Sequence, residues 1–124
     1  MPASAVRIGG DQSLCYSLGW RAGDFVFTAG QIAADDRGII VEGGIEAQTR
    51  VVMRRLDAIL QQAGCALADV VKATVWLQDA RDFRRFDTAY AEFFTGPPPA
   101  RSIVRADLVI DCKVEIEVVA YKPL

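Results

Sequence analysis

The hydrophobic pattern of this chain alternates between the two-residue period of strands and the period of about 3.6 residues that marks helices. In residues 45–62, apolar side chains recur at helical spacing, and Gly64 follows where a helix would end. In residues 70–78, apolar and polar side chains alternate, which predicts a strand with one apolar face. Both elements must bury one face, so the pattern predicts helices packed on a sheet.

Turn chemistry predicts a hairpin near the start of the chain. Residues 14–32 hold two β-rich segments on either side of Gly23-Asp24, a pair typical of turns. Residues 33–44 are rich in glycine and aspartate and predict a surface loop, with one brief strand at 39–41.

A second helix and two further strands complete the pattern. Asp79 or Asp82 can cap a helix whose aromatic residues, spaced three or four apart through 83–94, form a stripe typical of a core. A run of three prolines ends this helix, and residues 102–108 and 113–121 predict two more strands. The element order predicts an α+β fold with helices on one face of a mixed sheet.

The length bounds the domain organisation. At 124 residues and 52% apolar composition, the chain is predicted to form one domain over residues 1–124. The sheet face away from the helices would carry charged and aromatic side chains, including Lys72, Trp76 and Glu117. Two interpretations stay open: a solvated face, or an oligomer interface with ligand clefts.

Composition excludes several kinds of chemistry. The chain has no histidine, so no imidazole base, catalytic Ser-His pair or histidine metal ligand can operate. The net charge of −2 lacks the basic excess expected of a nucleic-acid partner. Three cysteines without CxxC spacing fit a reducing cytoplasm, and we interpret all three as small apolar fillers. No export signal or membrane-spanning run is apparent, so we expect a cytoplasmic protein without a membrane partner.

Arg101 and Glu115 are the first candidates for chemistry. Arg101 follows a rigid Pro-Pro-Pro-Ala segment and could grip a carboxylate through two parallel hydrogen bonds, or form a surface or interface salt bridge. Glu115 alternates with apolar residues in a predicted strand. It could act as a general acid or base, or pair with Arg101 or Arg105.

Two further residues have both a structural and a functional interpretation. Tyr16 could pack as a buried aromatic residue or line a pocket. Asp87 lies near the aromatic stripe, and it could be an exposed residue at the edge of the stripe or a buried functional carboxylate. Gly30-Gln31 lacks any nucleotide-binding context.

At the level of whole segments the chain resembles the YjgF/RidA family, also called the reactive intermediate deaminase or L-PSP endoribonuclease family. The resemblance runs nearly end to end. It is carried by residues 16–17, 21–31, 45–50, 69–75, 90–94, 99–102 and 114–120.

The resemblance implies a chorismate-mutase-like fold, assembled as a homotrimer with a central β-barrel and three clefts between subunits. It also implies hydrolysis of enamines and imines, of the 2-iminobutanoate and 2-iminopropanoate type, to 2-oxo acids and ammonia without metal or cofactor. The substrate would be a small carboxylate bound by Arg101, with Glu115 positioning or activating water and Tyr16 closing over it. The residues at matching pocket-lining or substrate-binding positions are Gly30, Gln31, Asp87 and Ile103.

Several residues around the expected pocket depart from the family pattern. These departures are Leu14, Cys15, Leu18, Ala29, Asp87, Ile103 and a shorter loop at 107–112. They leave open a relative acting on another imine or enamine acid, such as an aminomuconate, or a non-catalytic trimer that binds small carboxylates. The family's ribonuclease activity is not favoured for a chain without histidine and with a pI near 5.1.

Overall fold

The computed structural model describes residues 5–9 and 13–124. Within them, two α-helices and seven strands follow one another along the chain, with short 3₁₀ turns at Leu67–Asp69 and Ala80–Asp82. The elements are β1 (Ala5–Ile8), β2 (Gly19–Ala22), β3 (Phe25–Thr28), β4 (Gln31–Ile32), α1 (Ile45–Gln62), β5 (Val70–Leu77), α2 (Phe83–Ala91), β6 (Ala100–Arg105) and β7 (Val114–Tyr121).

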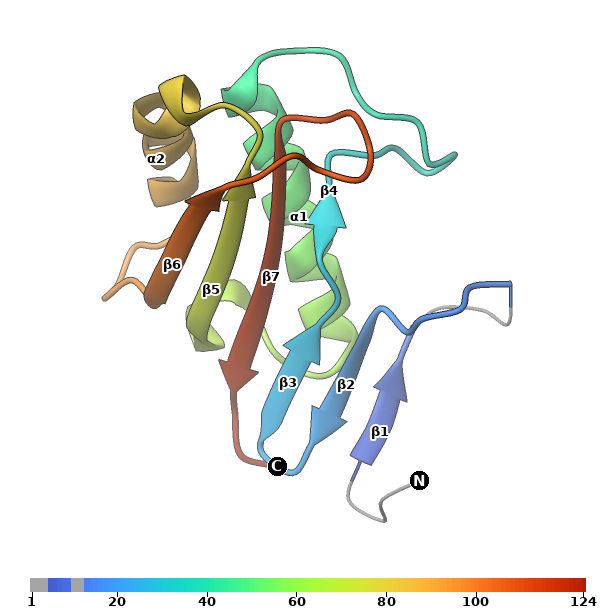
Figure 1. Cartoon of the computed structure of the whole chain (residues 1–124). Coiled ribbons are helices and arrows are strands. Elements are labelled where there is room, and N and C mark those ends of the chain that lie inside the picture. The colour runs from blue at the N-terminus through green and yellow to red at the C-terminus, as the bar shows by residue number, and fades with distance from the viewer. Residues whose placement is uncertain (1–4, 10–12) are drawn as a thin grey trace.

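The strands form one mixed sheet, and both helices cover the same face of it (Figure 1). The strand order is β1-β2-β3-β7-β5-β6, with β4 pairing with β7 beside β3. Among the described strands only β5 and β6 run parallel, as expected for strands joined through a helix. The predicted α+β fold with two helices on one face of a mixed sheet is therefore confirmed.

The last two strands are not neighbours. β7 is central, between β3 and β5, whereas β6 lies at the edge beyond β5. The predicted bounds also shift: residues 106–108 follow the end of β6, and α2 ends at Ala91, before Phe93 and Phe94. Phe94 still packs against Tyr90, with ring centroids 4.9 Å apart.

The N-terminal part of the sheet differs from the predicted hairpin in two ways. Gly23, at φ 59°, makes the predicted turn, but β1 adds a strand that the sequence pattern did not predict. The brief strand expected at 39–41 is reduced to a single bridge between Ala34 and Ile40.

The core lies between the helices and the sheet. Val52, Met53 and Leu56 of α1 are fully buried, and they belong to one apolar cluster with Val75 and Ile116 of the sheet. Each such side chain contributes about 1.5–3 kcal/mol when it leaves water. This packing fixes α1 against β5 and β7, the strands that position the candidate site.

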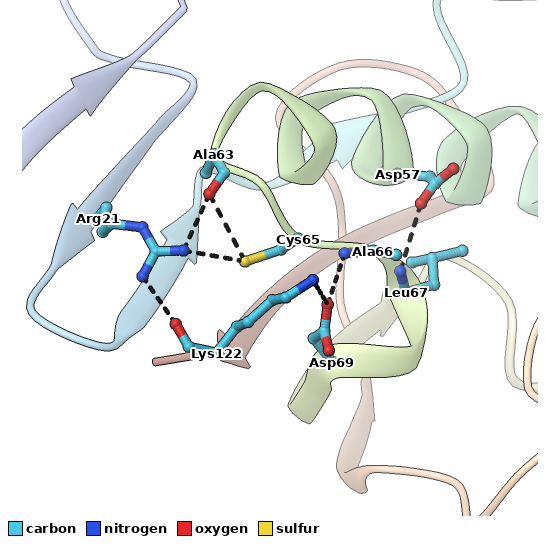
Figure 2. Close-up of polar contacts among 8 residues, drawn as sticks. All are labelled: Arg21, Asp57, Ala63, Cys65, Ala66, Leu67, Asp69 and Lys122. Carbon is cyan, nitrogen blue, oxygen red and sulfur yellow. Dashed lines mark hydrogen bonds and ion pairs between the residues drawn. The ribbon is translucent and has the colours of Figure 1, made fainter. Parts of the chain in front are cut away.

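A buried arginine, Arg21, connects segments that are far apart in the sequence (Figure 2). The guanidinium of Arg21 donates to the carbonyl oxygens of Ala63 and Lys122, both at 2.9 Å, and to the sulfur of Cys65 at 3.5 Å. These contacts join β2 to the end of α1 and to the segment after β7. Carbonyl groups thereby satisfy a charge that would be costly to bury alone.

The cysteine prediction is confirmed at two positions and wrong at the third. Cys65 and Cys112 are buried, as expected of apolar fillers, whereas Cys15 is exposed. Cys15 lies in the irregular segment before β2, where it cannot serve as a core residue.

Neither described helix is long and apolar enough to cross a membrane.

The face of the sheet away from the helices, here called the open face, carries exposed aromatic residues. Phe25, Phe27 and Tyr121 are each 42–46% exposed, and the Phe25 and Tyr121 rings lie 5.1 Å apart. Glu115 and Trp76 are opposite each other on neighbouring strands of the same face. No described helix covers this face (Figure 1).

Candidate functional site

Arg101 and Asp87 form an ion pair between β6 and α2. Arg101 lies beside Ala73, a fully buried residue of β5, so strand alternation turns its side chain toward the helices. Its Nη1 atom donates to Oδ1 of Asp87 at 2.7 Å. Arg101 thus makes a salt bridge with Asp87, and its grip on a ligand carboxylate stays a prediction.

Three aromatic rings of α2 surround the same guanidinium. Its carbon lies 5.9 Å from the ring centroid of Phe83, 5.6 Å from that of Phe86 and 5.0 Å from that of Tyr90. Rings at this range attract a cation through their negative faces. We call these three rings, Asp87 and Arg101 the arginine cluster.

A cavity of about 630 Å³ opens beside the arginine cluster. Its lining residues are Asp87, Thr88, Tyr90, Ala91, Phe94, Pro98, Pro99 and Arg101. The volume falls within the range of small-molecule sites, and the lining combines apolar walls with one cation and one anion. A small charged ligand could therefore be held here.

Tyr90 forms part of the wall of this cavity. The residue is 5% exposed, and its hydroxyl finds no hydrogen-bond partner among the described residues. Burial raises the pKa of the phenol, while the nearby Arg101 charge acts in the opposite direction. The phenol is therefore neutral at physiological pH and supplies a ring rather than a charge.

Glu115 lies on the open face with its carboxylate close against Gly30. A Cβ atom added to Gly30 would overlap the Oε2 atom of Glu115 and come within 3.1 Å of its Cδ atom. Only glycine leaves this carboxylate in place. Gly30 and Glu115, together with Glu117 two residues along β7, form what we call the carboxylate cluster.

The environment of Glu115 makes its carboxyl a weaker acid than that of an exposed glutamate. Burial, and then the negative charge of Glu117, raise the pKa of the Glu115 carboxyl above its ordinary value. No hydrogen bond or ion pair joins this carboxylate to another described side chain, so the predicted pairing with Arg101 or Arg105 is not observed. Such a carboxyl can exchange a proton nearer to neutral pH.

Gln31 points into the protein rather than onto the open face. It is 4% exposed, and its Oε1 atom accepts a hydrogen bond of 3.2 Å from Nε of Arg55 on α1. In β4 it pairs with Ile116, next to Glu115. Its side chain therefore holds β4 against α1, and only its backbone is near the carboxylate cluster.

The remaining predicted residues, Tyr16 and Ile103, belong to neither cluster. Tyr16 is 52% exposed and lies in the irregular segment before β2. It is therefore not the buried packing residue that was one of its two interpretations. Ile103 lines a separate hollow of about 280 Å³ with Leu77 and Phe83.

Within one chain, the arginine and carboxylate clusters lie on opposite faces of the sheet. Arg101 pairs with Ala73, and Glu115 pairs with Trp76, three residues further along β5. Two strand spacings of about 4.8 Å and a stagger of about 10 Å separate the Cα atoms. The two groups cannot act on one small molecule from the same chain.

Sequence reasoning missed the aromatic rings as partners of Arg101. The stripe was expected to be core, which is correct for Phe86 and Tyr90. The signal was present: Phe86, Asp87 and Tyr90 follow Phe83 by three, four and seven residues, so all four share one face of α2.

In the described part of the chain, no group of three or more Cys, Asp or Glu residues could hold a metal ion.

Comparisons with known proteins give a consistent result. The family model described as Endoribonuclease L-PSP matches residues 11–122. A RutC family protein of Pyrococcus horikoshii is 47% identical over 109 residues, which cover 86% of each chain. The 2-iminobutanoate/2-iminopropanoate deaminase of Salmonella typhimurium is 38% identical over 111 residues, covering 86% of this chain and 87% of that protein. The crystal structure of RidA from an Antarctic Psychrobacter species superposes with a TM-score of 0.87 at 31% identity, covering 94% of this chain and 98% of that one.

Proposed function

Because the chain belongs to the Endoribonuclease L-PSP family, which includes the YjgF/RidA proteins, we propose that it hydrolyses small 2-imino acids and their enamine tautomers. The products are 2-oxo acids and ammonia. The Salmonella relative, named for this reaction on 2-iminobutanoate and 2-iminopropanoate, supports the assignment. The cavity beside Arg101 is large enough for a substrate of this size.

The reaction needs one anchor and one proton-transfer group. Water adds to the imine carbon, the C–N bond of the resulting carbinolamine breaks, and the nitrogen leaves as ammonia. Arg101 holds the substrate carboxylate, and Glu115 takes a proton from the attacking water and returns it to the leaving nitrogen. The electrophile is already reactive, so the reaction needs no further cofactor or metal.

The observation that carries the proposal is the placement of Arg101 and Glu115 on opposite faces of one sheet. A complete site then combines Arg101 of one copy with Glu115 of a neighbouring copy. The uncovered aromatic residues Phe25, Phe27 and Tyr121 support assembly through the open face, since exposed apolar patches mark interaction surfaces. We propose the homotrimer with a central β-barrel that the family resemblance implies.

Other predicted residues keep their proposed roles. Tyr16, exposed in the segment before β2, closes over the substrate, and the backbone of Gly30 and Gln31 lines the cleft near Glu115. Ile103 contributes an apolar wall next to the arginine cluster. The free cysteines of the described chain fit a cytoplasmic location.

The activity can be tested with imines made in place. An amino-acid oxidase generates 2-iminobutanoate or 2-iminopropanoate, and semicarbazide traps whatever imine remains. We expect the wild-type protein to reduce the trapped imine and the Arg101→Ala variant to lose this effect. Arg50→Ala is the matched control, because Arg50 makes a bidentate ion pair with Glu92 and neither residue lines the cavity. No acceleration by the wild-type protein would contradict the proposal.

Assembly needs its own measurement. Sedimentation equilibrium is expected to give about three times the chain mass of 13.5 kDa. A protein that sediments as a monomer at assay concentration contradicts the shared site.

A further inference from the structure

Asp87 already occupies part of the site that a substrate carboxylate needs. Its Oδ1 atom accepts from Nη1 of Arg101 at 2.7 Å, and both residues line the 630 Å³ cavity. The Asp87 side chain is 43% exposed and that of Arg101 is 22% exposed, so this ion pair faces the space where a ligand would bind. An incoming carboxylate meets a cation that has a negative partner.

The position of Arg101 does not depend on Asp87 alone. The rings of Phe83, Phe86 and Tyr90 hold the guanidinium at 5.0–5.9 Å. A guanidinium has five N–H donors, and one hydrogen bond joins it to Asp87. A ligand carboxylate can therefore share the arginine with Asp87, but the two negative charges then lie close together and repel each other.

The chemistry of the ligand decides how large that repulsion is. A protonated 2-imino acid carries a positive nitrogen on the carbon next to its carboxylate. When the carboxylate binds Arg101, this nitrogen can approach the Asp87 carboxylate and form a charge-assisted contact. A 2-oxo acid has a neutral carbonyl oxygen at the same place, so only the repulsion remains.

We infer that Asp87 is a specificity-determining residue, an inference that rests on the proposed function. Asp87 makes the Arg101 site accept zwitterionic 2-imino acids and reject anionic 2-oxo acids. The reaction converts the first class into the second. Asp87 therefore favours departure of the product as soon as the nitrogen has left. The same charge pattern, one cation beside one anion, selects against small acids that lack a positive nitrogen.

Two stable probes separate the charge types without turnover. The probe 2-oxobutanoate is a monoanion, and L-2-aminobutanoate is a zwitterion that the protein cannot hydrolyse. Dissociation constants are measured by titration calorimetry or ligand-observed NMR for the wild-type protein and for Asp87→Asn. We expect Asp87→Asn to bind 2-oxobutanoate about tenfold more tightly and L-2-aminobutanoate about tenfold more weakly, since one charge pair changes in each case.

Controls tie the effect to this site. Arg101→Met is expected to lose binding of both probes. Glu92→Gln removes a carboxylate next to α2 that pairs with Arg50 rather than Arg101, and it is expected to change neither constant. Thermal melts of each variant check that the protein remains folded.

The outcomes distinguish this inference from the proposed function. A wild-type protein without imine hydrolysis whose Asp87→Asn variant still reverses the probe preference would contradict the proposed function and support the selectivity. An Asp87→Asn variant with unchanged or weaker 2-oxobutanoate binding would overturn the inference. Binding that survives in Arg101→Met would also overturn it, because the probe would then lie elsewhere, and so would the absence of binding to any folded form.

Discussion

Arg101 and Glu115 are charged residues on two strands of one sheet, and their surroundings differ in the features that govern a charge. Arg101 has an anionic partner at 2.7 Å and three aromatic rings around it. Glu115 is partly buried, lies two residues from Glu117 and has a raised pKa. The arginine cluster keeps a charge fixed in one place, whereas the carboxylate cluster favours gain and loss of a proton. Binding and proton transfer are thus assigned to different parts of the fold.

The largest expected effect comes from removing the proton-transfer group. Glu115→Gln keeps the shape of the side chain but cannot exchange a proton, so we expect kcat to fall by about 10²- to 10⁴-fold with a small change in KM. Steady-state kinetics with imine made in place measures both constants. Glu92→Gln is the control, because the Glu92 carboxylate pairs with Arg50 and lies outside the carboxylate cluster, and it is expected to keep most of the activity. A Glu115→Gln enzyme with kcat within tenfold of wild type would contradict the proton-transfer role of Glu115.

Removing the anchor is expected to affect mainly substrate binding. A hydrogen bond to a charged group contributes about 1.5–3 kcal/mol, so Arg101→Met is expected to lower kcat/KM by about 10- to 150-fold, largely through KM. Arg50→Met tests loss of an arginine elsewhere on the surface. An unchanged KM in folded Arg101→Met would contradict the assignment of substrate binding to the arginine cluster.

A smaller effect is expected when the carboxylate is displaced rather than removed. A Cβ atom at Gly30 would overlap the Glu115 carboxylate, so Gly30→Ala is expected to lower kcat by about tenfold. Gly96→Ala is the matched control, because a Cβ atom there would meet nothing within 4 Å. Equal activities of the two variants would show that Glu115 needs no fixed position.

The smallest expected effect concerns stability and pH. Because the pKa of Glu115 is raised in the folded chain above the ordinary value of 4.5, the unfolded chain loses this proton first as pH rises. Between the pKa of Glu115 in the unfolded chain and its higher pKa in the folded chain, the folded state holds more protons. The free energy of unfolding therefore falls as pH rises through this window. We expect Glu115→Gln to have a slightly higher Tm than wild type at pH 7, with the difference vanishing below the ordinary pKa. Calorimetric scans across this range check the sign, and a higher Tm for wild type at pH 7 would contradict the raised pKa.

Much of the fold follows from local pattern. The period of residues 45–62 matches α1, and the alternation of residues 70–78 matches β5 except for its last residue. The missed strand β1 has four residues and is formed by pairing with β2, a contact that no local pattern specifies. The central place of β7 likewise depends on pairing with β3 and β5, which are far from it in sequence.

The site was less accessible from sequence. Arg101 and Glu115 stand out by residue type, but their separation onto opposite faces depends on strand register. The partner of Arg101 was also hidden, because Asp87 meets it only when α2 packs beside β6. Spacing alone places Asp87 among the aromatic residues of α2, and only tertiary packing brings the guanidinium there.

Complementation between two impaired variants, assayed at a substrate concentration well below KM, tests most directly whether each site is shared between copies. Arg101→Met and Glu115→Gln chains are unfolded together in equal amounts, refolded and assayed against each variant treated alone. If each site takes Arg101 from one copy and Glu115 from its neighbour, random assortment restores about one quarter of the wild-type sites. Recovery near this level is the predicted result. A mixed sample that assembles but has no more activity than its parents would place both residues in one chain's site and contradict the shared cleft.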